Sequence, residues 1–160
     1  MTMLILGIGN TLLQDEGAGV HVLEALRQHH SEPEDVTYLD GGTLSFTLAG
    51  MVEEAQSLIV IDAAQLHRHP GAIACFINEE MDAFLGQGKR SVHEVGLLDL
   101  LDMARLAGRL PVQRALVAIQ PATIDWGESP STEVLAAIPT AVKQVNTLMT
   151  QWRSQHESGA

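Results

Sequence analysis

Residues 4–20 read LILGIGNTLLQDEGAGV, an apolar run followed by a glycine turn and then by the start of a helical pattern. This order predicts a buried strand over Met3–Ile8 and a helix over Gly19–His29. The turn between them carries two adjacent carboxylates, Asp15 and Glu16, at the place where a nucleotide-binding turn would hold a phosphate. The role of these carboxylates is therefore the main question that the sequence raises.

Short apolar runs alternate with helical patterns along the rest of the chain. Further strands are predicted over Val36–Leu39, Ser57–Ile61, Ala72–Ile77 and Ala115–Ile119. Helices are predicted from about Leu44 to Glu54, His93 to Leu106 and Thr132 to Trp152, with a kink or a break at Pro139. Alternating strands and helices are typical of the three-layer α/β/α class, here with a five-stranded mixed, mostly parallel twisted sheet.

One connection decides the direction of the fourth strand. Only about ten residues separate it from the third strand, whereas a parallel crossover takes a dozen or more. The fourth strand is therefore expected to run antiparallel. Residues 1–160 are predicted to form a single domain, in which the last eight residues or so are disordered.

Composition excludes several classes of partner. The chain has 20 acidic and 9 basic residues, a formal charge of −11, so neither nucleic acid nor an anionic membrane surface is expected to bind it. No apolar stretch approaches the roughly 20 residues that cross a bilayer. Cys75 is the only cysteine, which rules out an internal disulfide and favours a cytoplasmic protein.

The glycine turn fits nucleotide binding poorly. Gly7 and Gly9 match the dinucleotide fingerprint, and Asp40 resembles its ribose-binding acid, but Leu12 stands where the third glycine belongs. Two carboxylates beside a phosphate would repel it more strongly than backbone N–H groups attract it. No Gly-Lys-Ser or Gly-Lys-Thr follows the turn, so a nucleotide-binding module is the disfavoured alternative.

Acidic side chains instead gather at one predicted sheet edge. Glu16 follows the first strand and Asp62 ends the third, while His93 stands where a loop enters a helix with Ser91 as its expected N-cap. Two carboxylates and an imidazole make an incomplete shell for a borderline metal such as nickel, zinc or manganese. For Asp15 and Asp40 we favour helix capping or bracing of the glycine turns.

A paired-carboxylate mechanism remains open, with Asp15 or Glu16 facing Asp62. Nucleophilic catalysis finds no support, because Gly-x-Ser-x-Gly is absent and the lone cysteine is predicted to be buried in a strand.

Five motifs in register resemble the nickel–iron hydrogenase maturation endopeptidases. They are GIGNTLLQDEGAGV, LDGGT, LIVIDA, SVHEVGL and AIQP, spread from about Met3 to Val145. The segment WGESPSTEV, Trp126 to Val134, only loosely resembles the family's late glycine-proline segment. The resemblance implies a mixed sheet between helices and an enzyme that removes a C-terminal extension from the hydrogenase large-subunit precursor after nickel insertion.

The resemblance also implies a set of functional residues. Carried over motif by motif, the catalytic and metal-contacting residues are Glu16, Asp62 and His93. Residues near the substrate cleft are implied to be Asp15, Asp40, Gly41, Gly42 and Thr43. Nickel is expected to arrive in the precursor, with zinc or cadmium as substitutes in vitro, and hydrolysis to use metal polarisation or a carboxylate-activated water as in aspartyl proteases. The alternative is a non-catalytic nickel chaperone of hydrogenase assembly.

Overall fold

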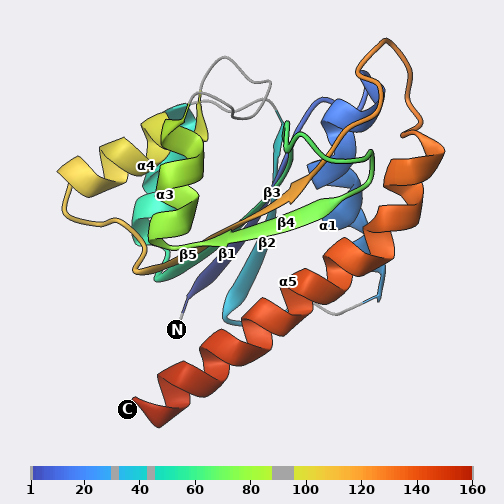
Figure 1. The fold of residues 1–160 in the computed structure, drawn as a ribbon. Helices are drawn as coiled ribbons and strands as arrows, with labels where there is room; N and C mark the ends of the chain where they lie inside the picture. The colour runs from blue at the N-terminus through green and yellow to red at the C-terminus, as the bar shows by residue number, and fades with distance from the viewer. Residues whose placement is uncertain (1, 30–32, 43–45, 88–95, 160) are drawn as a thin grey trace.

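The computed structural model describes residues 2–29, 33–42, 46–87 and 96–159. Five strands and five α-helices form three layers (Figure 1). The strands are β1 (Met3–Ile8), β2 (Val36–Gly42), β3 (Ser57–Ala63), β4 (Ile73–Ile77) and β5 (Gln113–Ile119). The helices are α1 (Ala18–His29), α2 (Ala49–Glu54), α3 (Glu79–Gly86), α4 (Leu97–Leu106) and α5 (Thr132–Ser158), with short 3-10 turns η1 (Gln14–Gly17) and η2 (Phe46–Leu48).

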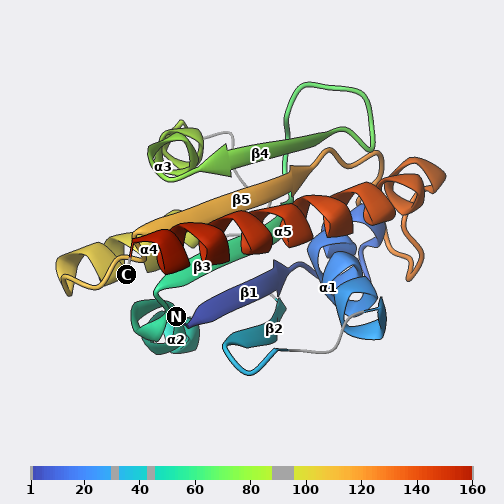
Figure 2. The same ribbon diagram turned by 90° about the horizontal axis from the view of Figure 1, so that it is seen from below.

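The sheet has the order β2-β1-β3-β5-β4, which Figure 2 shows from below. Strands β2, β1, β3 and β5 are parallel, and β4 pairs with β5 in the antiparallel direction. The predicted mixed sheet is confirmed, and so is the direction of its fourth strand. The short link from β3 to β4 returns the chain to the same edge of the sheet without a crossover helix.

Each face of the sheet is covered by its own helices. Alternate residues of β1 show the division: Met3 and Ile5 pack with α1 and α5, whereas Leu4 and Leu6 pack with α2, α3 and α4. All six side chains of β1 and all seven of β3 are buried, as expected for central parallel strands. The described residues include no helix long and apolar enough to cross a membrane.

Several elements differ from the prediction. Helix α3 was not predicted, because it is short and only Met81 and Leu85 of its eight residues are buried. Helix α4 begins at Leu97, since Gly96 at its N-cap is extended; Ser91, the predicted cap, lies outside the described residues. Strand β2 continues to Gly42 through the predicted turn.

A kink or a break was predicted at Pro139. Helix α5 is one continuous helix, so the prediction of a break is wrong. Proline removes the hydrogen bond to the carbonyl of Leu135, but both residues are exposed, and water can solvate that carbonyl. The helix also runs to Ser158, beyond the predicted end at Trp152, so most of the terminal residues expected to be disordered are helical.

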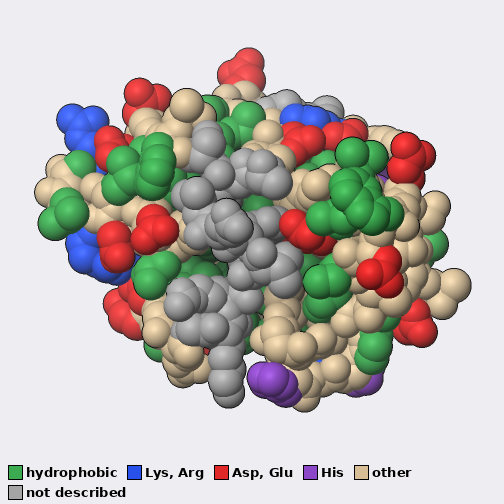
Figure 3. All heavy atoms as spheres, turned by 90° about the horizontal axis from the view of Figure 1, so that it is seen from above, with side chains coloured by type: hydrophobic (Ala, Val, Ile, Leu, Met, Phe, Trp, Pro, Cys, Tyr) green, Lys and Arg blue, Asp and Glu red, His purple; other side chains and the backbone are tan. Residues whose placement is uncertain are grey.

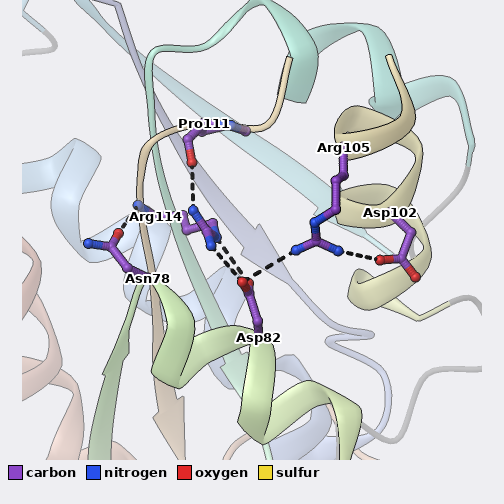
Figure 4. Close-up of polar contacts among 6 residues, drawn as sticks. All are labelled: Asn78, Asp82, Asp102, Arg105, Pro111 and Arg114. Carbon is purple, nitrogen blue, oxygen red and sulfur yellow. Dashed lines mark hydrogen bonds and ion pairs between the residues drawn. The ribbon is translucent and has the colours of Figure 1, made fainter. Parts of the chain in front are cut away.

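A buried arginine ties the second helical layer to the sheet (Figure 4). Arg114 of β5 is only 7% exposed, and its guanidinium donates to both carboxylate oxygens of Asp82 on α3, at 3.0 and 2.5 Å. Arg105 of α4 donates to the same carboxylate at 3.3 Å and to Asp102 at 2.8 Å. Asp82 therefore links α3, α4 and β5, and its hydrogen bond is the main reason why the pKa of Arg114 is raised.

Candidate active site

Glycines allow η1 and α1 to lie directly against the sheet. A side chain at Gly19 would overlap the carbonyl oxygen of Ile61 in β3 and would come within 2.5 Å of the carbonyl oxygen of Ile8. A side chain at Gly9, whose φ is +141°, would overlap the carbonyl oxygen of Glu16. The glycines therefore allow backbone segments to approach each other closely, and this packing places η1 over the carboxyl ends of β1 and β3.

This packing brings Glu16 and Asp62 to the same edge of the sheet. Glu16 lies in η1 and is 9% exposed, while Asp62 lies near the end of β3 and is 1% exposed. The alternation along β3 places the Asp62 side chain with Leu58 and Val60, on the face covered by α2, α3 and α4. Two nearly buried carboxylates at the carboxyl ends of parallel strands are suited to bind a divalent cation or to activate water.

Asp15 has a different role from its neighbour. Its carboxylate is fully buried, and it accepts hydrogen bonds from the backbone N–H groups of Ala122, Thr123 and Ser131 and from the Ser131 hydroxyl, at 2.7–3.1 Å. Burial raises the pKa of this carboxyl, but the hydrogen bonds from Ser131, Thr123 and Ala122 together outweigh it and leave the pKa below its ordinary value. Asp15 is thus a bracing residue, but it braces a segment far away in the chain and not its own glycine turn, which the favoured alternative had predicted.

The segment that Asp15 braces is the one leading into α5. Ser131 is the N-cap of that helix, and its hydroxyl accepts from the backbone of Val134 at 3.3 Å. The same segment pairs with the first turn, since Gln14 donates to the carbonyl of Gly127 at 2.8 Å and Gly127 donates to that of Leu12 at 2.9 Å. The weakly matching stretch Trp126–Val134 therefore lies beside the Asp15-Glu16 motif.

Asp40, Gly41 and Gly42 of the DGGT motif form the end of β2. Asp40 accepts a hydrogen bond from the backbone of Gly42 at 2.8 Å, so it braces its own turn. Gly42 accepts one from Gly9 at 2.8 Å, which joins this turn to the first. A side chain at Gly41 would press on Leu6. Thr43 lies outside the described residues, so its predicted place near the cleft remains a prediction.

His93 also lies outside the described residues. Among the described residues, no group of three His, Cys, Asp or Glu side chains is placed to hold a metal ion. The structure thus places Glu16 and Asp62 at the same edge of the sheet, while their shared site with His93 remains a prediction. The end of α3 and the start of α4 lie toward the same edge as the carboxyl ends of the parallel strands (Figure 1).

Sequence reasoning missed several residues that shape this edge. Gln120, which follows β5 and is 5% exposed, accepts a hydrogen bond from the backbone of Leu66 at 2.7 Å and so fixes the loop after β3. Gln120 belongs to the AIQP motif, and this was the feature of the sequence that could have indicated its importance. Gln14 adopts φ +50°, a strained conformation for a residue with a side chain, next to the two carboxylates.

Comparison with known proteins agrees with this arrangement. A family model described as hydrogenase maturation protease matches residues 20–148. The hydrogenase expression/formation protein HupD of Rhodobacter capsulatus is 35% identical over 159 residues, which cover 99% of this chain and 76% of that protein. The hydrogenase 2 maturation protease of Escherichia coli K12 is 38% identical, over 91% of this chain and 88% of its own.

Solved structures give the same result. The hydrogenase maturating endopeptidase HybD from E. coli superposes with a TM-score of 0.88 at 35% identity, covering 94% of this chain and 93% of that one. The maturation protease HybD from Thermococcus kodakarensis superposes with a TM-score of 0.78 at 31% identity, covering 92% and 99%. Since the motifs, the fold and the relatives all agree, the chain belongs to the hydrogenase maturation protease family and is a peptidase.

Proposed function

We propose that this protein removes the C-terminal extension of the nickel–iron hydrogenase large-subunit precursor after nickel has been inserted. The family supports the reaction class, and the pair Glu16 and Asp62 supports the site. That pair is the observation on which the proposal depends most. Both acids are almost completely shielded from water, yet they lie at the open end of a parallel sheet, where α/β proteins bind their ligands.

Nickel enters this reaction as part of the substrate. In the proposal, Glu16 and Asp62 supply carboxylate oxygens to the nickel of the precursor and His93 supplies an imidazole nitrogen. This contact orients the scissile peptide bond beside the carboxylates, which lowers the entropic part of the barrier. Water then attacks, activated either by the metal or by a carboxylate. Zinc or cadmium would fill the same shell in vitro, and the reaction would take place in the cytoplasm.

The test is the mass of the purified precursor after incubation with the protein, with and without nickel in the precursor. We expect shortening only of the nickel-loaded form, and loss of it in Glu16→Gln, Asp62→Asn and His93→Ala. The control is Glu54→Gln, an exposed acid at the end of α2, which should cleave normally.

Two results would contradict the proposal. Cleavage at the wild-type rate by any of the three variants would remove that residue from the site. Binding of nickel-loaded precursor without any change in mass would instead favour the chaperone alternative.

A further inference from the structure

Three of the large apolar side chains that the structure leaves exposed lie on the two segments that pair next to the Asp15-Glu16 motif. Leu12 is 50% exposed, Ile124 is 46% exposed and Trp126 is 80% exposed. We call these three residues the apolar rim. An exposed tryptophan with apolar neighbours is typical of a surface that binds another protein, because water solvates such a surface poorly.

The apolar rim is a built feature of the fold. Its residues come from two segments more than a hundred positions apart, joined by the parallel bridge between Leu13 and Gly127. The carbonyl of Thr123 also accepts a hydrogen bond from the backbone of Asp15 at 3.0 Å, one residue before Glu16. The backbone bonds and the Asp15 carboxylate together fix the rim relative to the candidate active site.

The two segments that carry the rim are acidic. Residues 1–26 and 115–142 contain no lysine or arginine, whereas Asp125 and Glu128 are exposed in the same loop as Trp126. Figure 3 looks down on this end of the molecule, and hydrophobic and acidic side chains lie next to one another on the right half of the face. This charge would attract a segment rich in lysine and arginine, and the Trp126 ring can contact such cations with its face.

We propose that the apolar rim docks a segment of the precursor that carries both apolar and Lys or Arg side chains, next to the peptide bond to be cut. This inference rests on the proposed function, since it assigns the rim to the same substrate. The rim supplies binding and position, while Glu16 and Asp62 contact the reacting region. A change in the rim should therefore alter KM much more than kcat.

The experiment measures kcat and KM for cleavage of the nickel-loaded precursor by Trp126→Ala, with Leu106→Ala as the matched control. Leu106 is 89% exposed at the end of α4, on the other face of the sheet. We expect Trp126→Ala to raise KM at least about tenfold with kcat nearly unchanged, the size of a strong interface residue. Leu106→Ala should match the wild type.

A second variant tests the charge. Asp125→Lys combined with Glu128→Lys should raise KM and weaken its dependence on salt, because it removes the attraction that salt screens. Urea unfolding of each variant shows whether the fold is kept.

The outcomes separate this inference from the function itself. If the wild type does not shorten the precursor, the proposed function fails. If the wild type does so but Trp126→Ala behaves as Leu106→Ala, or lowers kcat at unchanged KM, the docking role of the rim is wrong. It is also wrong if sedimentation shows a dimer of the wild type that Trp126→Ala dissociates, since a second copy then covers the rim.

Discussion

Replacing Asp15 by asparagine should destabilise the protein at neutral pH and change how stability depends on acid. In the wild type, Oδ2 accepts hydrogen bonds from Ala122, Thr123 and the Ser131 hydroxyl, and Oδ1 accepts one from the Ser131 backbone. Asparagine can place its amide oxygen where Oδ2 lies in the wild type. Its NH2 group then takes the place of Oδ1 and faces the Ser131 N–H, so that two donors face each other. The remaining bonds also lose the assistance of the negative charge.

The size of the effect follows from these bonds. A hydrogen bond to a charged group contributes about 1.5–3 kcal/mol, and a buried donor left without a partner costs about 1–3 kcal/mol. Because the site is fully buried, little of this is recovered by water. We expect Asp15→Asn to lower the free energy of unfolding by about 2–4 kcal/mol at pH 7.

The pH dependence has a definite sign. The folded-state pKa of Asp15 lies below its ordinary value, so its contribution to stability is complete above that ordinary value and is lost as the pH falls through the folded-state pKa. The difference in free energy of unfolding between wild type and Asp15→Asn should therefore become smaller below about pH 4.

Urea unfolding at a series of pH values measures this difference, with Asp125→Asn as a control for an exposed acid in the same loop. Equal stability of wild type and Asp15→Asn at pH 7 would refute the reasoning. A difference that does not shrink in acid would show that charge is not its cause.

Three further substitutions test the packing, each by urea unfolding at pH 7. Gly19→Ala should lower the free energy of unfolding by about 3 kcal/mol or more, since its methyl group would overlap backbone oxygens of β1 and β3. Its control, Gly50→Ala, has open space around it in α2 and should be neutral or stabilising by up to about 1 kcal/mol. Asp82→Asn should lower the free energy of unfolding by about 3–5 kcal/mol, because it leaves the buried Arg114 without its charge partner. Its control, Asp102→Asn in an exposed ion pair, should lower it by at most about 1 kcal/mol. Pro139→Ala should stabilise α5 by about 1–3 kcal/mol, and a loss of stability there would mean that the ring packs favourably.

The strands could be predicted because their signal is local. Strands β1, β3 and β5 are short apolar runs in which nearly every side chain is buried, and the length of one link was enough to fix the direction of β4. Helix α3 has only two buried side chains one turn apart, so its pattern is too weak to recognise. The start of α4 could not be predicted correctly because Gly96, at its N-cap, has no side chain that signals a cap.

Some residues of the candidate site could likewise be predicted from the sequence, and others could not. Glu16 and Asp62 could be chosen because parallel strands end at one edge, so their positions in the chain imply their positions in space. The partner of Asp15 could not be inferred, since Ser131 lies 116 residues away and a single hydrogen bond leaves no periodic pattern. The apolar rim was missed for another reason, because a sequence shows that Trp126 is apolar but not that it is 80% exposed.

The negative charge in the glycine turn has a physical explanation. Asp15 and Glu16 lie in η1, which leads into helix α1 at Ala18, so acidic residues stand at the place in the chain where a nucleotide-binding turn would hold a phosphate. In a nucleotide-binding fold the same helix end would be free to bind a phosphate. Here the Asp15 carboxylate instead holds the loop that carries Trp126, because it accepts hydrogen bonds from N–H groups on both sides of that residue. Under the proposed function, Glu16 and Asp62 at the same edge meet the positive charge of a metal ion and not a phosphate.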